Sequence, residues 1–159
     1  RSRGLGDVYK RQLLRLSTPS GYTLSHANEF HECIGGAECN VAVNLAQLRQ
    51  HVAFASCVPS HALGKKVLHH LQQYGVHTSH IKMVDGRLGI YFVETGESVR
   101  FSQVIYDRTH SSFSQLTEWI WDNDTLLENV DLLHITGITA GLSSYWHDLT
   151  LDLVMEAYH

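Results

Sequence analysis

The chain has 159 residues, of which 43% are hydrophobic and 18% are charged, a composition that suits one folded domain with a packed core. Its 12 Lys and Arg and 16 Asp and Glu residues give a formal net charge of −4. They form no basic stripe, which argues against nucleic acid as the main partner. No apolar run approaches the roughly 18 residues that a membrane span requires, so we expect no membrane partner.

The first twelve residues, RSRGLGDVYKRQ, are basic and rich in glycine, without a clear period. Residues 2–12 can be back-translated into the transposase adapter that is used to prepare sequencing libraries. We therefore interpret residues 1–12 as an adapter-like, non-native segment and exclude them from the predicted fold. The alternative is a genuine basic N-terminal arm.

From Leu13 onward, predicted strands and helices alternate along the chain, with strands read from short apolar runs and helices from apolar residues at helical spacing. Gly75 marks the end of the second helix, and Ser143 or Ser144 is expected to cap the last one. The last helix should bury Trp146, Leu149, Leu153 and Ala157 on one face. The predicted elements are a strand end over 13–18, a helix over 38–48, a buried strand over 51–58, a helix over 62–76, a buried strand over 130–138 and a helix from 144 onward.

Two further segments, GIYFVE and VRFSQVIYD, are separated by the turn-rich residues TGES and predict a β-hairpin. The strand–helix alternation predicts an α/β fold in which helices flank a parallel sheet. The hairpin has no place in that sheet, so we expect it to form a lid over one end. The chain also stops inside a predicted helix.

Gly35 and Gly36 come directly before the first predicted helix. They lack the GxGxxG spacing of a dinucleotide site and the GK[ST] ending of a P-loop, so a tight turn and a ligand site are equally supported. Asn40 lies in the first turn of that helix, where its amide can donate and accept hydrogen bonds. Such an uncharged group suits hydroxyls better than phosphates.

Tyr106 and Arg108 are two residues apart in the predicted hairpin and share one face of the strand. An arginine can bind a carboxylate through two hydrogen bonds, and a neighbouring tyrosine can bind a hydroxyl beside it. Tyr91 in the facing strand could join them. The spacing alone slightly favours ordinary exposed strand residues, with Arg108 paired to an acidic neighbour, Asp107 or Glu94.

The segment HITGITAG follows the strand predicted over 130–138. In open parallel sheets, ligands bind beyond the carboxyl ends of the strands. Gly137 would allow a ligand to approach the backbone closely, and Ile138 could form an apolar wall. A simple glycine turn before a helix is equally compatible with this pattern.

Cys33, Cys39 and Cys57 form no CxxC pair and are odd in number, which favours a reduced, cytoplasmic protein over a disulfide framework. The twelve histidines fall into no HExxH or other strong metal-binding pattern. We therefore expect no metal site in this chain.

The segments GGAECNVAVNLAQL, LQQYGVHTSHI, GRLGIYFVETGESVRFSQVIYDRTHSSFS and LHITGITAGLS together resemble the ribokinase-like (PfkB) sugar kinases, most closely their 2-keto-3-deoxygluconate kinase branch. The resemblance runs from about Leu13 to the end of the chain. It implies a ribokinase-like fold whose lid is formed by segments at about 19–34 and 87–108. It also implies ATP and Mg²⁺ as cofactors, a sugar acid as substrate and a homo-oligomer that forms through the lid.

The same resemblance implies roles for individual residues. Gly35, Gly36 and Asn40 match the family's sugar-binding helix start. Tyr91, Tyr106 and Arg108 match residues that hold the keto-acid sugar, and Ile138 matches a position whose backbone borders the sugar.

The family's catalytic aspartate, its glycine-rich anion hole and its ATP pocket lie in a C-terminal half that we do not find in this chain. We therefore expect the chain to be the N-terminal, sugar-binding half of a kinase, without a catalytic residue and without activity of its own. Arg49 and Gln50 also stand where relatives often have glycine. The alternatives are another sugar kinase of the family, of the fructokinase or ribokinase type, and a non-catalytic sugar-binding module.

Overall fold

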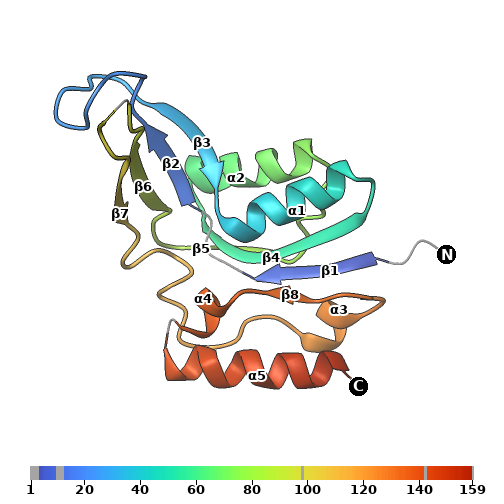
Figure 1. Cartoon of the computed structure of the whole chain (residues 1–159). Coiled ribbons are helices and arrows are strands. Elements are labelled where there is room, and N and C mark those ends of the chain that lie inside the picture. The colour runs from blue at the N-terminus through green and yellow to red at the C-terminus, as the bar shows by residue number, and fades with distance from the viewer. Residues whose placement is uncertain (1–3, 10–12, 98, 142, 159) are drawn as a thin grey trace.

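The computed structural model describes residues 4–9, 13–97, 99–141 and 143–158 and contains two four-stranded sheets (Figure 1). The strands are β1 (Gly4–Tyr9), β2 (Leu13–Ser17), β3 (His31–Gly35), β4 (His51–Pro59), β5 (Ile81–Val84), β6 (Gly89–Glu94), β7 (Gln103–Asp107) and β8 (His134–Ile135). The helices are α1 (Ala37–Gln47), α2 (Ala62–Gln73), α3 (Asn123–Leu127), α4 (Gly137–Ala140) and α5 (Ser144–Tyr158).

The first sheet, here called the core sheet, is parallel throughout and has the order β5-β4-β1-β8. Successive side chains of its strand β4 reach opposite faces of the sheet. Val52, Phe54 and Val58 pack in a cluster with residues of α1 and α2. Ala55 and Cys57 pack in a second cluster with residues of α3 and α5. Helices therefore cover both faces, as parallel sheets require.

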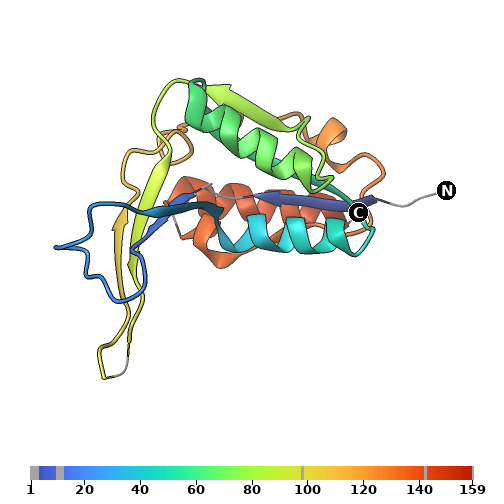
Figure 2. The same ribbon diagram turned by 90° about the horizontal axis from the view of Figure 1, so that it is seen from above.

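The second sheet has the order β3-β2-β6-β7 and stands at one end of the core sheet (Figure 2). Strand β2 pairs with β3 in antiparallel and with β6 in parallel orientation, and β6 and β7 form the antiparallel hairpin. Leu14 and Ile34 from one face of this sheet join the cluster with α1 and α2. The opposite face stays open.

The predicted α/β architecture and the additional β-hairpin are confirmed. Helices α1, α2 and α5 and strand β4 lie where the sequence pattern places them. The Ser143 hydroxyl accepts a hydrogen bond from the Trp146 amide at 3.3 Å, which identifies Ser143 as the cap of α5. Trp146 and Leu153 are buried and Leu149 is half-buried, whereas Ala157 is exposed, so the buried face of α5 ends earlier than predicted.

The exclusion of residues 1–12 from the fold is wrong for Gly4–Tyr9, because these residues form β1 between β4 and β8. The two flanking strands do not pair with each other, so a strand at this position is needed to join them. The predicted adapter-like origin of the segment is a separate matter and stays a prediction. Residues 1–3 and 10–12 lie outside the described part of the chain.

Three other predictions of strand position are corrected. Residues 13–17 do not end a core-sheet strand but form β2 of the second sheet, because the chain passes from one sheet to the other after Tyr9. The strand predicted over 130–138 shrinks to β8, because α4 already begins at Gly137. The link of the hairpin spans residues 95–102 and is longer than TGES.

Arg49 closes α1 in a backbone conformation that usually requires glycine. Its φ is 63°, its amide donates to the Ala46 carbonyl at 2.9 Å, and the Gln50 amide donates to the Leu45 carbonyl at 3.1 Å. These two bonds form a Schellman motif, in which the left-handed position strongly favours glycine. The arginine therefore carries a steric cost that the surrounding turn has to offset.

Replacing Arg49 with Gly should raise the free energy of unfolding by about 0.5–1 kcal/mol, because glycine adopts a positive φ without a Cβ clash. Urea unfolding followed by circular dichroism measures this change. Arg49→Ala is the matched control, since it removes the same charge but keeps the Cβ. An equal gain in both variants would assign the effect to the charge instead of the backbone.

Candidate functional site

The open face of the second sheet carries most of the predicted site residues in two cross-strand rows. In the first row, Arg15 of β2 lies between Cys33 of β3 and Tyr91 of β6, and Tyr106 of β7 follows. In the second row, Leu13 lies between Gly35 and Gly89. Arg108 completes this row, since its Cα and Cβ lie 3.5 and 3.4 Å from the position that a Cβ on Gly89 would occupy. The topology therefore brings together residues from four strands.

Tyr91, Tyr106 and Arg108 form one stack on this face. The two tyrosine rings are 5.8 Å apart between centroids and inclined by 28°, and the Arg108 guanidinium carbon lies 4.4 Å from the Tyr106 centroid. A cation over an aromatic ring is attracted to it, which restricts the arginine side chain. No described residue forms a salt bridge with this guanidinium, so the donors along its edge are available for a ligand.

The alternative that pairs Arg108 with Asp107 or Glu94 is wrong. Asp107 binds the Arg87 guanidinium through two bonds of 2.9 and 2.5 Å, and the carboxylate of Glu94 lies 3.4 Å from Arg100 Nε. Among the residues that the structure describes, Arg108 has no acidic partner. It is a half-buried cation that is held in place but not neutralised.

Arg15 is a member of the site that the sequence analysis missed. It is half-buried, and its Nε has no hydrogen-bond partner among the described residues. Burial raises the pKa of the neighbouring Tyr91 phenol, and the positive charge of Arg15 partly offsets this effect. The sequence does contain a sign of this role, because Arg15 is the single charged residue between Leu14 and Leu16. The alternation of side chains along a strand places it on the face opposite these two leucines.

Gly35 and Gly36 have different structural roles. A Cβ on Gly35 would lie 2.7 Å from the Tyr91 hydroxyl, so a larger residue would require the Tyr91 ring to shift from its position over this strand. Gly36 is the N-cap of α1 with φ 141°, a conformation that disfavours other residues. The backbone N–H of Asn40 donates to the Gly36 carbonyl at 3.0 Å, and the Asn40 side chain is exposed in the first turn of α1.

The predicted site residues Gly137 and Ile138 lie at the start of α4, directly after its N-cap Thr136. Gly137 is exposed, and no described residue outside its chain neighbours and the backbone of its own helix lies within 4 Å of the position that its Cβ would take. The Ile138 side chain lies outside the described part of the structure. Thr136 donates a hydrogen bond to Glu38 in the first turn of α1, so the two glycine-containing turns are directly linked. Figure 1 shows the starts of α1 and α4 at the end of the core sheet that faces the second sheet.

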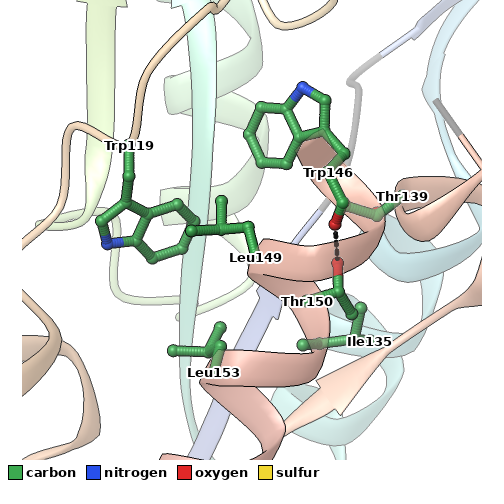
Figure 3. A pocket seen from close by; sticks show the side chains of 7 residues that line it. All are labelled: Trp119, Ile135, Thr139, Trp146, Leu149, Thr150 and Leu153. Atoms are coloured by element: carbon green, nitrogen blue, oxygen red, sulfur yellow. Dashed lines mark hydrogen bonds between the residues drawn. The ribbon is translucent and has the colours of Figure 1, made fainter. Parts of the chain in front are cut away.

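A small hollow near α5 is distinct from this site (Figure 3). It is lined mainly by apolar side chains, including Trp119, Trp146 and Leu153, and has a volume of about 10 Å³. That volume is at the lower limit for a single water molecule. The hollow is therefore a packing gap and cannot hold a sugar.

Among the described residues, no group of three or more His, Cys, Asp and Glu side chains is arranged to hold a metal ion. None of the described helices is both long enough and apolar enough to span a membrane.

The fold and the position of the site define a class of proteins. A parallel sheet with helices on both faces and a ligand-accessible end is typical of α/β proteins that bind small molecules. The chain belongs to the pfkB family of carbohydrate kinases, whose family model matches residues 7–159.

Similar proteins are known in sequence and in structure. The 2-dehydro-3-deoxygalactonokinase of Haloferax volcanii is 31% identical over 150 residues, which cover 94% of this chain and 47% of that protein. A PfkB family carbohydrate kinase from Listeria grayi superimposes with a TM-score of 0.93 at 36% identity, over 97% of this chain and 48% of that one. The 2-dehydro-3-deoxygluconokinase of Thermotoga maritima superimposes with a TM-score of 0.91 at 34% identity, over 98% of this chain and 47% of that one. The chain thus spans about half the length of these relatives.

The ion pair between Arg87 and Asp107 closes the base of the hairpin next to Arg108. The hydrogen bonds from Arg87 lower the pKa of the Asp107 carboxyl below its ordinary value. A lowered pKa in the folded state contributes stability at pH values above the ordinary pKa, and this contribution is lost as the pH falls through the lowered value.

Asp107→Asn should therefore unfold at a lower urea concentration than the wild type at pH 7. The difference should shrink once the pH falls below about 3.9, the ordinary pKa of aspartate. Asp152→Asn on the exposed side of α5 is the control. A difference between wild type and Asp107→Asn that stays constant from pH 7 to pH 2 would show that the pair does not stabilise the hairpin.

Proposed function

We propose that the whole protein to which this chain belongs transfers the γ-phosphoryl group of ATP to 2-keto-3-deoxygluconate and forms 2-keto-3-deoxy-6-phosphogluconate. The observation that carries this proposal is the Arg108 guanidinium, which is fixed over Tyr106 and has no acidic partner among the described residues. An unneutralised arginine with free donors is suited to a carboxylate. A neutral sugar would leave that charge unpaired.

In the proposed complex, Arg108 binds the substrate carboxylate, and Arg15 adds a second positive charge one row away on the same face. Tyr91 has a raised pKa because of burial, so its phenol remains protonated and can donate a hydrogen bond. Tyr106 supports Arg108 and borders the keto group. The open face would thereby bind the acidic end of the sugar.

The hydroxyl end of the sugar would lie at the starts of α1 and α4. Asn40 offers an amide to the hydroxyls, and Gly35 and Gly36 leave the backbone accessible. The exposed backbone at Gly137, followed by the backbone of Ile138, would border the sugar on the other side. In this arrangement the two arginines bind the carboxylate, and the hydroxyl to be phosphorylated lies at the other end of the sugar.

The remaining parts of the reaction are assigned to the rest of the whole protein. Phosphoryl transfer requires in-line positioning, charge stabilisation by Mg²⁺ and a base for the attacking hydroxyl. We propose that the ATP pocket and the catalytic aspartate lie outside this chain, which itself contributes sugar binding and is inactive. We assign the activity to the cytoplasm. The second sheet would cover the bound sugar and, through exposed residues such as Val99 and Phe101, contact a second copy.

Replacing Arg108 with Ala in the whole protein should raise the KM for 2-keto-3-deoxygluconate by about 10- to 100-fold, the usual effect of losing a charged hydrogen-bonded pair. The KM for ATP should stay within about twofold. Lys65→Ala on the exposed side of α2 is the control. Steady-state kinetics with each substrate varied in turn measure both constants. Equal effects on both substrates would refute the carboxylate role.

The substrate class is tested by competition in the same enzyme. A panel of 2-keto-3-deoxygluconate, its galacto epimer, fructose and ribose should yield preference for the two acids in the wild type. Arg108→Ala should remove most of this preference. Faster turnover of fructose or ribose by the wild type would instead support a fructokinase- or ribokinase-type activity.

The 159-residue chain alone should show no turnover that depends on both ATP and the sugar acid. A coupled assay for ADP release measures this directly. Turnover that survives further purification and requires both substrates would contradict the assignment of the catalytic machinery to the rest of the protein. Binding of the sugar acid to the whole protein, combined with no phosphorylation under any condition, would favour a non-catalytic sugar-binding module.

A further inference from the structure

We propose that Glu38 and Thr136 form a positioning bridge that holds the α4 turn against the start of α1 and so sets the width of the sugar site. The expected effect on sugar binding rests on the proposed function, since it assumes that a sugar lies between these two turns. Its structural basis does not depend on the identity of the sugar.

Glu38 is an unusual residue for its position. It lies in the first turn of α1, between Gly36 and Asn40, and its side chain is completely buried. Burying a carboxylate is costly unless hydrogen bonds and nearby positive charge compensate for the lost water. The N-terminus of α1 supplies part of this compensation, since the helix dipole favours a negative charge there.

The Thr136 hydroxyl supplies a further hydrogen bond, which it donates to Glu38 Oε1 across 98 positions of the sequence. Thr136 is the N-cap of α4, where a threonine oxygen ordinarily accepts a hydrogen bond from an amide of its own helix. The Thr136 hydroxyl accepts no such bond within the described part of the chain. Its hydroxyl instead connects α4 to α1.

Helix α4 depends on such an anchor because it has only four residues, Gly137–Ala140. A helix of one turn is unstable by itself, since nucleation costs more than the few hydrogen bonds return. Its backbone bonds run from Thr139 N to Thr136 O at 3.1 Å and from Gly141 N to Gly137 O at 3.0 Å. Fixing Thr136 therefore fixes the residue whose carbonyl accepts the first of these two bonds.

The bridge has a direct consequence for sugar binding. It connects the turn that carries Asn40 to the turn that presents the open backbone of Gly137. Without the bridge, the two turns can move apart, and reordering them on binding reduces the net free energy of sugar binding. The nucleotide, which we assign to the rest of the protein, should be little affected.

The test compares two substitutions of Thr136 in the whole protein. Thr136→Val removes the hydroxyl and should raise the KM for 2-keto-3-deoxygluconate by about 10-fold or more, while the KM for ATP stays within about twofold. Thr136→Ser keeps the hydroxyl and should restore the wild-type KM to within about threefold. The matched control is Thr150→Val, because Thr150 also donates a hydrogen bond, to the Trp146 carbonyl at 2.6 Å, but lies in α5 (Figure 3).

Three kinetic results would overturn the proposal. The first is an unchanged KM for the sugar in Thr136→Val, and the second is a Thr136→Ser variant that is as impaired as Thr136→Val. The third is an equal effect of Thr150→Val, which would indicate general destabilisation. If the wild type uses another sugar of the test panel, the same comparison is made with that sugar.

Amide hydrogen exchange in the 159-residue chain tests the bridge without any substrate. Thr136→Val should accelerate exchange at Thr139 and Gly141 at least about 10-fold relative to Phe54 and His77, whose amides bond within the core sheet region. Unchanged exchange at Thr139 and Gly141, or equal acceleration at all four amides, would overturn the bridge. A wild-type protein that phosphorylates no sugar would refute the proposed function alone, and exchange would then decide the bridge.

Discussion

The site depends on one constraint, which is that the second sheet buries one face and leaves the other open. Leu14 and Ile34 are drawn into the core with α1 and α2, and the alternation of side chains then sends Arg15 and Tyr91 to the opposite face. A shift of β2 by one residue would bury the arginine and expose the leucine. The hydrophobic core therefore fixes the chemistry of the open face through the alternation of side chains along each strand.

The distribution of charge on the hairpin follows from that constraint. The alternation of side chains places Asp107 and Glu94 on the face opposite the open face, where they pair with Arg87 and Arg100, respectively. Arg108 lies on the open face and packs against the ring of Tyr106 instead of pairing with a carboxylate. Both acids of the hairpin that could have neutralised Arg108 are thus committed elsewhere, which keeps its charge available for a ligand.

The sequence predicted the regular parts of this structure because apolar periodicity determines them. It placed α1, β4 and α2 correctly and identified Tyr91, Tyr106 and Arg108, three of the residues that meet on the open face. It did not predict that β2 changes sheets, since five residues with apolar alternation fit either sheet equally well. It also missed Arg15 and Glu38, whose importance comes from contacts with strands and turns that lie far away in the chain.

The paired glycines show how a local pattern acquires its meaning from distant residues. Next to a helix start, Gly35 and Gly36 are compatible with a phosphate site, a sugar site or a turn. In the fold, Gly35 makes room for the Tyr91 ring and Gly36 provides the left-handed entry into α1. The first turn of that helix already contains the fully buried carboxyl group of Glu38, bonded to Thr136. A carboxylate at this position competes with an anionic ligand for the positive end of the helix, so the helix start is better suited to neutral hydroxyls than to phosphate.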